Sequence, residues 1–298
     1  MNQVKISHLV TEKRNPKTMN LDNLNTLELL KVMNEEDRTV AESIENEIEH
    51  IEKAVVGIIE ALNKNGRLFY VGSGTSGRLG VLDAVECPPT FGTTNEIVGI
   101  IAGGDSAFVK AKEGAEDSRE QGAIDIESAG VTENDVVVGI AASGRTPHTI
   151  GALEKANEIG ALTVCLACNK NSEVGKIAKI AIEVEVGPEV ITGSTRLKAG
   201  TAQKLVLNML STASMVGIGK TYKNLMVDLK ATNLKLIERS KRIIMEATEC
   251  SYDLAEKVFE ESGRNCKLAI VMIMLDCNKE EAERKLNASN GFISKAVV

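Results

Sequence analysis

From Leu21 to Leu62, apolar side chains recur every three to four residues, a period typical of amphipathic helices. The stretch Asn25-Thr-Leu-Glu has the spacing of a capping box and opens one helix, and a second helix is predicted over Thr39–Leu62. Asn63–Gly66 then breaks the pattern. We therefore predict an N-terminal helical segment, residues 1–62, that packs on the rest of the chain.

The pattern then changes to short apolar runs, which indicate strands buried on both faces of a sheet. Helix-compatible segments separate these runs, as in a parallel sheet covered on both sides. The runs are Arg67–Val71, Ile97–Ala102, Asp135–Ala141, Leu162–Ala167 and Ile180–Val186, and the segments between them are Arg78–Val85, Phe108–Gly122, Thr149–Glu158 and Val174–Ala178. We predict an α/β fold, a three-layer αβα sandwich whose five-stranded parallel sheet has the flavodoxin-like order 2-1-3-4-5.

A long helix is predicted over Thr195–Val216, and the chain ends in shorter helices. Ser251 has the position of an N-cap in this last part, and Lys279–Leu286 forms its final helix. We assign residues 63–234 to the α/β domain and residues 235–298 to a small C-terminal helical module.

The composition excludes some classes of function. The chain has 298 residues, 43% of them apolar, and a net charge of −7 without a run of Lys or Arg. With five Phe, three Tyr and no Trp, it lacks the clustered cations and stacking aromatics of a nucleic-acid surface. Its longest apolar run, Leu268–Leu275, is too short to span a membrane.

The first residues contain no apolar stretch typical of a secretory signal, so we expect a cytoplasmic protein with reduced cysteines. The spacing Cys165-x-x-Cys168 suggests a redox or metal site. Both residues fall in an apolar run, with no second such pair and no histidine nearby. Because a zinc site needs four ligands, we interpret them as buried strand residues.

Two small, hydroxyl-rich loops follow the first and third predicted strands and lead into helices. They are Gly72-Ser-Gly-Thr-Ser-Gly77 and Ala141-Ala-Ser-Gly-Arg-Thr-Pro147. Backbone N–H groups at a helix N-terminus suit an anion, and the loops add hydroxyls from Ser73, Thr75, Ser76, Ser143 and Thr146. In the predicted order these strands are neighbours, so both loops should meet in one crevice.

The first loop also fits G-x-G-x-x-G, the pattern of a dinucleotide-binding turn. A dinucleotide site needs an acidic residue for the ribose about 20 positions further on. The candidate here, Asp105, lies well beyond that spacing. A P-loop is excluded because no Gly-Lys-Ser/Thr follows. The spacing favours a monophosphate site, with a dinucleotide site and a purely structural turn as the alternatives.

Carboxylates are the main candidates for proton transfer, because the chain has only three histidines, of which His148 follows the second loop. Glu86 ends the first predicted helix of the α/β part, where the dipole and poor solvation favour a protonated acid; the alternative is a solvated helix end. Glu86 lies about 13 Å along a helix from Gly77, which puts it far from its own phosphate loop unless the helix bends; the alternative is a pocket completed by a second subunit. The acidic stripe Glu113, Glu116, Asp117 and Glu120 is more typical of a solvated helix face.

These residues resemble the N-acetylmuramic acid 6-phosphate etherases, which have the sugar-isomerase-type phosphosugar-binding fold. The resemblance covers nearly the whole chain, and the stretches ECPPT and EGAEDSRE are specific to this family. The matching stretches are TEKRNP, NEEDRTVA, GSGTSGRLGVLDAVECPPTFG, IAGGDSAFVKAKEGAEDSRE, VVVGIAASGRTP, EVITGSTRLKAGTAQKLVLNMLST and NLMVDLKATNLKL. His148 departs from the family pattern, where a tyrosine is more usual, so no ring-specific role is carried over to it.

The resemblance implies a carbon–oxygen lyase that removes the D-lactyl ether of N-acetylmuramic acid 6-phosphate by β-elimination and rehydration. The products would be N-acetylglucosamine 6-phosphate and D-lactate, in the recovery of cell-wall amino sugars. The family pattern places the proton donor at Glu86 and a second catalytic acid at Glu116. It also implies a homodimer with a shared active site, a small phosphosugar as the substrate, and no metal or nucleotide cofactor.

The same resemblance suggests further binding residues. Arg78 and Arg145 would pair with the phosphate or the lactyl carboxylate, since Arg suits bidentate contact to either, or else with an acidic side chain of the protein. The remaining binding candidates are the two loop glycines and the start of the long helix: Gly74, Gly144, Ser194, Thr195, Arg196 and Lys198.

Two other functions fit the same fold. One is a non-catalytic sugar-phosphate sensor similar to the glucokinase regulatory proteins, although a sensor has no need of both Glu86 and Glu116. The other is an aldose–ketose phosphosugar isomerase.

Overall fold

The computed structural model describes residues 9–231 and 233–298. The start of the stretch in which no export signal was found, Met1–His8, lies outside the described residues. The chain divides into two compact units. One comprises the chain up to Val85 together with Glu96–Ser211, and the other comprises Glu86–Asn95 together with Thr212–Val298.

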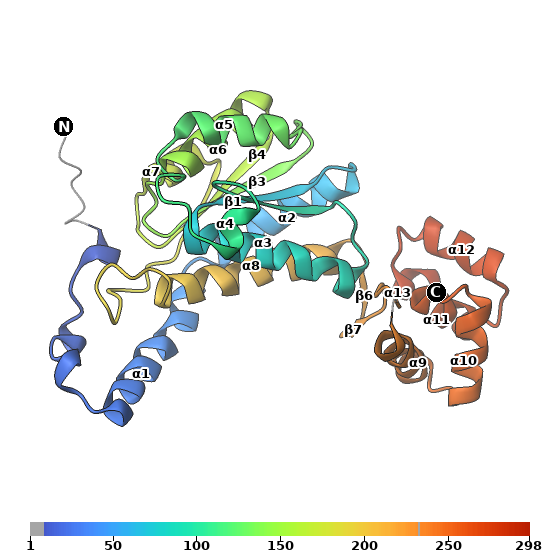
Figure 1. Ribbon diagram of the computed structural model, residues 1–298. Helices are drawn as coiled ribbons and strands as arrows, with labels where there is room; N and C mark the ends of the chain where they lie inside the picture. Colours follow the sequence, from blue (N-terminus) through green and yellow to red (C-terminus); the bar gives the residue numbers. More distant parts are fainter. Residues whose placement is uncertain (1–8, 232) are drawn as a thin grey trace. The chain divides into compact units, whose positions relative to one another are not determined.

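The first unit is built on a five-stranded parallel sheet in the order β2-β1-β3-β4-β5 (Figure 1). This confirms the predicted α/β fold and strand order. The strands are β1 (Leu68–Gly72), β2 (Ile97–Ile101), β3 (Val136–Ala141), β4 (Leu162–Ala167) and β5 (Ile180–Glu183). The register pairs Gly72 with Ile140, so the loops after β1 and β3 leave the same edge of the sheet side by side.

Helices cover both faces of this sheet. On one face lie α5 (Arg119–Ser128), α6 (Pro147–Ile159) and α7 (Glu173–Ile177), and on the other lie α2 (Ile48–Asn63), α3 (Gly74–Phe91) and α8 (Lys198–Gly217). Alternate strand residues serve the two faces: Phe69 and Val137 pack in one cluster with Leu153 of α6, while Tyr70 and Ile140 lie against α3 at Gly80.

The N-terminal part contains short 3₁₀ turns at Val10–Glu12, Pro16–Thr18 and Leu21–Asn23, followed by α1 (Thr26–Glu45). The predicted capping box is present, with both reciprocal hydrogen bonds between Asn25 and Glu28. The predicted start of the second helix at Thr39 is wrong, because α1 continues to Glu45. The break falls instead at Glu47, whose buried carboxylate accepts from the backbone N–H of Glu183 and pairs with Lys170.

The helix predicted over Phe108–Gly122 is also wrong. A short helix α4 covers only Ser106–Val109, and α5 begins at Arg119 after its N-cap, Ser118. Between them Gly114 has a φ of +74°, which a helix does not allow. The acidic stripe therefore does not exist as a helix face, because three of its four members lie in this irregular segment: Glu113, Glu116 and Asp117.

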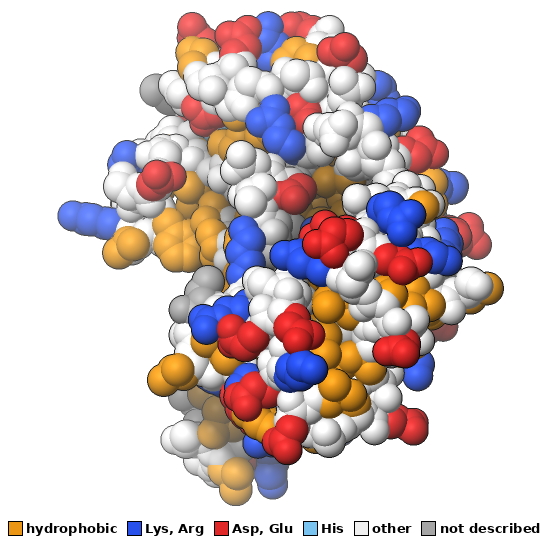
Figure 2. All heavy atoms as spheres, turned by 90° about the vertical axis from the view of Figure 1, so that its right-hand side faces the viewer, with side chains coloured by type: hydrophobic (Ala, Val, Ile, Leu, Met, Phe, Trp, Pro, Cys, Tyr) orange, Lys and Arg blue, Asp and Glu red, His pale blue; other side chains and the backbone are white. Residues whose placement is uncertain are grey.

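The second unit carries the helical module, which in the structure comprises residues 218–298, because the hairpin before α9 and the segment that follows it share the apolar core of the helices. Its elements are the hairpin β6 (Thr221–Tyr222) and β7 (Leu225–Met226), then α9 (Leu234–Thr248), α10 (Tyr252–Glu261), α11 (Cys266–Leu275), α12 (Lys279–Ala288) and α13 (Ile293–Ala296). The mostly apolar helix α11 is buried at the centre of their core. Viewed from this side, Figure 2 shows acidic and basic side chains interspersed, as on a solvated surface. Among the described residues, no helix is long and apolar enough to cross a bilayer.

A buried ion pair joins α1 to the start of α8 within the first unit. The Lys198 ammonium lies 2.7 Å from Oε2 of Glu36, which also accepts a hydrogen bond of 2.8 Å from Asn15, and Lys17 reaches the other carboxylate oxygen at 2.9 Å. Burial raises the pKa of Glu36, but these hydrogen bonds outweigh it and bring the pKa down to about 2. The carboxylate therefore stays charged and holds the long helix to the N-terminal segment.

The Glu36→Gln variant tests this pair. Breaking a buried pair leaves Lys198 uncompensated, so we expect the free energy of unfolding to fall by about 3 kcal/mol at pH 7. The pKa of Glu36 is about 2 in the folded protein and 4.5 ordinarily, so its stabilisation is complete above pH 4.5 and is lost as the pH falls towards 2. Urea unfolding at several pH values should show a smaller acid loss in the variant. Glu35→Gln, at an exposed neighbour, is the control; equal effects of the two changes would contradict the assignment.

Candidate active site

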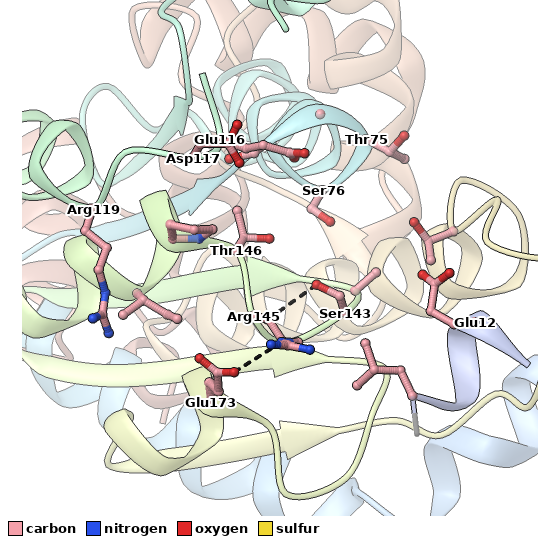
Figure 3. Close-up of a pocket in the computed structure, with 17 residues that line it drawn as sticks. Glu12, Thr75, Ser76, Glu116, Asp117, Arg119, Ser143, Arg145, Thr146 and Glu173 are labelled. Carbon is pink, nitrogen blue, oxygen red and sulfur yellow. Dashed lines mark hydrogen bonds and ion pairs between the residues drawn. The ribbon is translucent and has the colours of Figure 1, made fainter. Parts of the chain in front are cut away.

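A cavity of about 610 Å³ opens where the loops after β1 and β3 meet. Figure 3 shows Thr75 and Ser76 from the first loop facing Ser143 and Thr146 from the second. Further residues come from the N-terminal turn, the segment before α5, and α7. The cavity is lined by Leu9, Glu12, Ser73, Gly74, Thr75, Ser76, Glu116, Asp117, Arg119, Ala142, Ser143, Arg145, Thr146, Pro147, Ile150, Glu173 and Thr195.

The first loop is shaped by its glycines. A Cβ at Gly77 would lie 2.5 Å from the carbonyl oxygen of Gly72, so both the strand end and the first turn of α3 need glycine to approach so closely. Gly74 has a φ of +55° and turns the chain into the helix. The Ser76 hydroxyl donates to the side chain of Gln203 on α8, 3.0 Å away. The buried Ser73 hydroxyl has no partner among the described residues and lines the cavity at the N-terminus of α3.

The second loop presents another helix N-terminus to the same cavity. Thr146 is the N-cap of α6, but its side chain makes no capping hydrogen bond, and Pro147 occupies the first helical position. Gly144 has a φ of +73°, and a Cβ there would overlap the Cβ of Ser172. The Ser143 hydroxyl accepts a hydrogen bond of 3.3 Å from the backbone N–H of Arg145. The cavity is therefore flanked by two helix N-termini, each of which favours negative charge.

Glu116 reaches the cavity from the irregular segment before α5. Its backbone carbonyl accepts a hydrogen bond of 3.0 Å from the N–H of His148, next to the second loop. Two glycines let α5 and α6 pack closely: a Cβ at Gly122 would overlap the carbonyl oxygen of His148, and one at Gly151 would overlap that of Arg119. The backbone of Glu116 is thus fixed to the loop that carries Ser143 and Thr146.

His148 itself does not line the cavity. Its ring is fully buried, with Nε2 2.8 Å from Oδ2 of Asp125 on α5. This contact ties α6 to α5 and gives His148 a place in the support of Glu116.

Charged side chains of both signs surround the cavity. Arg145 pairs with Glu173 through Nε at 3.1 Å, as Figure 3 shows, and Arg119 pairs with Glu154 at 3.1 Å. The Arg119 side chain is 56% exposed and that of Arg145 is 25% exposed, so solvent reaches both. A ligand with a phosphate and a carboxylate would find cations as well as helix N-termini here.

The amino-acid sequence matches the models of two known protein families. Residues 50–157 match the model of the glucokinase regulatory protein N-terminal SIS domain, and residues 118–213 match that of the SIS domain. An N-acetylmuramic acid 6-phosphate etherase from Bacillus cereus strain 03BB102 is 60% identical over 293 residues, covering 98% of this chain and 100% of that protein. An etherase from Bacillus anthracis has the same identity and coverage. The chain belongs to the N-acetylmuramic acid 6-phosphate etherase family.

A solved structure supports the fold independently. A phosphoheptose isomerase from Francisella tularensis covers 65% of this chain and 100% of its own, with a TM-score of 0.51 and 16% identity. At that identity the likeness concerns the fold alone.

Several residues expected to bind the substrate of an etherase have protein partners in the structure. Arg78 donates to the backbone carbonyls of Ala107 and Phe108, each at 2.8 Å, and lines a smaller cavity of about 190 Å³ that shares Ser73, Gly74 and Glu116 with the larger one. Lys198 is buried against Glu36. Of the residues at the start of α8, Thr195 lines the main cavity, whereas Ser194, Arg196 and Lys198 do not; nor does Gly144.

Glu86 does not end its helix as the sequence predicted. α3 continues through Pro88 and Pro89 to Phe91, and the Glu86 side chain is exposed to solvent. It lies twelve residues beyond Gly74, about 18 Å along the helix axis, and does not line the cavity. The poor solvation expected for it is therefore absent in this single chain.

Four charged residues at the cavity were not among the predicted site residues: Glu12, Asp117, Arg119 and Glu173. Glu12 belongs to the stretch TEKRNP, one of those that carry the family resemblance. Asn169 brings that stretch to the second loop, since its side chain accepts from the N–H of Val10 and donates to the carbonyl of Ala142. No local sequence signal links Thr11 or Glu12 to residues about 130 positions further on.

The paired cysteines are buried, as predicted. Cys165 lies on β4 and Cys168 just beyond it, and both are fully shielded from solvent. Burial raises the pKa of the Cys165 thiol to about 12 and also raises that of Cys168, so both stay protonated and unreactive. Within the described part of the chain, no three His, Cys, Asp or Glu side chains are grouped so as to hold a metal ion.

The close approach of α5 to α6 is tested by Gly122→Ala. In an ordinary helix this change stabilises by about 1 kcal/mol. Here the new methyl group would overlap the carbonyl oxygen of His148, so we expect a loss of about 1–3 kcal/mol in the free energy of unfolding. Denaturant unfolding measures the change, with Ser128→Ala at an exposed position of the same helix as the control. A stabilised Gly122→Ala protein would mean that the two helices are not held in contact.

Proposed function

We propose that this enzyme removes the D-lactyl ether of N-acetylmuramic acid 6-phosphate and gives N-acetylglucosamine 6-phosphate and D-lactate. The observation that carries the proposal is the 60% identity to etherases over 98% of the chain. The cavity supports it, because two helix N-termini and several hydroxyls suit a phosphorylated sugar. The reaction belongs to the catabolism and recycling of cell-wall amino sugars, and we place it in the cytoplasm, with no nucleic acid or membrane as a partner.

The sugar phosphate binds at the N-terminus of α3 in this proposal. The unpaired Ser73 hydroxyl, the Thr75 hydroxyl and the first N–H groups of the helix are available as donors to its oxygens. Ser143, Thr146 and Arg145 face this group across the cavity and contact the rest of the substrate, including its lactyl carboxylate. Arg145 can exchange its exposed partner Glu173 for a substrate carboxylate, since guanidinium binds either in the same geometry.

Proton transfers then carry the reaction. In the ring-opened sugar the proton on C2 is acidic because C1 is an aldehyde carbon, and Glu116 at the cavity accepts it. Glu86 donates a proton to the ether oxygen on C3, so that D-lactate leaves with the electrons of the C–O bond. Water then adds to C3 of the unsaturated sugar and restores a hydroxyl group. Each positioned carboxyl group contributes about 10²–10⁴-fold.

Glu86 performs this role in the cavity of a second copy of the chain. Its exposed side chain shares a face of α3 with Leu82 and Val85, which are 44% and 55% exposed. Apolar side chains beside an exposed carboxyl are typical of a surface that another protein covers. We therefore propose a homodimer in which α3 of each protomer brings Glu86 to the partner's cavity.

Mass spectrometry of the reaction in ¹⁸O-enriched water tests the activity. Purified protein with N-acetylmuramic acid 6-phosphate should release unlabelled D-lactate and a sugar phosphate carrying one ¹⁸O, because water adds at the sugar. Label in the lactate would overturn the elimination mechanism. Ligand binding without any product would instead indicate a sugar-phosphate sensor, and conversion between glucosamine and fructose phosphates would indicate an isomerase.

Mixing two inactive variants tests the shared site. Glu86→Gln and Glu116→Gln should each lower kcat about 10²–10⁴-fold. A mixed dimer of the two variants has one cavity with both wild-type carboxyl groups only if Glu86 acts across the interface. Random reassortment of subunits should then restore about a quarter of the wild-type activity. Activity that stays at the level of the separate variants would place both groups in one protomer or rule out the dimer.

A further inference from the structure

The end of α3 that carries Glu86 is weakly supported by its own helix. Pro88 and Pro89 have no N–H, so the carbonyl groups of Ala84 and Val85 receive no hydrogen bond from the next turn. The Thr90 hydroxyl donates a hydrogen bond of 2.9 Å to the carbonyl of Glu86, a contact within the same turn. The backbone N–H of Gly92 still donates to the carbonyl of Pro88 at 3.0 Å, but two hydrogen bonds between successive turns are missing, so contacts outside the helix gain weight in orienting this turn.

Those groups belong to the segment that follows β7 in the helical module. The chain leaves α3 at Gly92, which has a φ of +66°, and a Cβ there would overlap the backbone carbonyl oxygen of Asp228. The next residue, Thr93, is 2% exposed, and its carbonyl accepts a hydrogen bond of 3.3 Å from the ammonium group of Lys230. The end of α3 thus rests directly on the backbone around Asp228.

Asp228 is in turn fixed to the core of the module. Its carboxylate lies 2.6 Å from the ammonium of Lys267 on α11 and 3.5 Å from that of Lys220. Lys267 is 8% exposed and the side chain of Asp228 is 17% exposed, so water reaches this pair only in part. The residues on either side of Asp228, Val227 and Leu229, are buried in the apolar core of the module. A continuous set of contacts therefore runs from α11 through Asp228 to the turn that ends α3.

We propose that the C-terminal helical module positions the catalytic acid. Through Lys267 and Asp228 the module holds the turn at Gly92 and Thr93. The position of this turn sets the direction in which the side chain of Glu86 projects from α3. This inference rests on the proposed role of Glu86 as proton donor. Lys267, Asp228 and Gly92 are positioning residues, because they act through Glu86 and are not among the residues that line the cavity.

Two substitutions weaken this support without touching the cavity. Gly92→Ala forces the turn away from Asp228, and Lys267→Met removes the buried cation at similar side-chain length. A displacement of about 1 Å in a catalytic group can cost about 10²-fold in rate, so we expect kcat to fall between 10- and 100-fold in each variant. KM should change little. Exchange of the C2 proton in ²H₂O, which needs Glu116 and not Glu86, should continue near the wild-type rate.

Matched controls separate positioning from loss of stability. Gly263→Ala also places alanine at a positive φ, +75°, in the module, but its nearest neighbour is the flexible end of Lys279. Lys241→Met removes another largely buried lysine, one that pairs with Glu256 on α10. Both controls should keep the wild-type kcat at temperatures where all variants are folded by circular dichroism.

Combination with Glu86→Gln completes the test. If Gly92 acts through Glu86, the double variant Glu86→Gln/Gly92→Ala should be no slower than Glu86→Gln alone. A further loss in the double variant, or equal losses in Gly92→Ala and Gly263→Ala, would overturn the positioning role. A Glu86→Gln enzyme with full activity would instead overturn the proposed function of Glu86 itself, which distinguishes the two failures.

Discussion

The parallel pairing of β1 with β3 is the constraint on which the candidate site depends. Because Gly72 lies opposite Ile140, the two loops that follow these strands leave the sheet at the same level and share one crevice. Gly77 has no side chain and lets the first turn of α3 approach the end of β1. The polar groups of both loops then converge at this edge of the sheet. Backbone geometry alone thus creates a place for an anion before any charged residue is considered.

A second backbone contact extends this site to a segment without regular structure. Residues 110–118 form neither helix nor strand, yet the N–H of His148 holds the carbonyl of Glu116 beside the second loop. The contact is possible because Gly122 and Gly151 allow α5 and α6 to pack backbone against backbone. The backbone of Glu116 is thereby held beside the second loop although it belongs to an irregular segment. Its side chain remains exposed at the cavity, where a substrate can reach it.

Local signals explain what could be predicted from the sequence. Buried strands appear as short apolar runs, and glycine with hydroxyl residues after a strand marks a turn into a helix, so the sheet order and the two loops were predictable. The segment around Glu116 was not, because its acidic residues also suit a helix face, and Gly114 with the Ser118 cap decides otherwise. The burial of Lys198 could not be predicted either, because its partner Glu36 is 162 positions away in the chain. Such tertiary pairs have no local pattern.

The two carboxyl groups proposed for catalysis differ in how they are held, and the difference follows from the sequence around them. Glu116 is fixed within the first unit by backbone contacts close to the cavity. Glu86 lies where two prolines remove the hydrogen bonds that would make the last turn of α3 rigid. In a helix weakened in this way, the carboxyl group of Glu86 would move too far for efficient proton transfer unless other residues held it in place. The buried apolar core of the module, with the Lys267–Asp228 pair beside it, supplies the contacts that can confine it. The proline pair and the module therefore act together. The prolines remove hydrogen bonds between the last turn of α3 and the rest of the helix, and the module, packed on the residues that follow, sets the orientation of that turn.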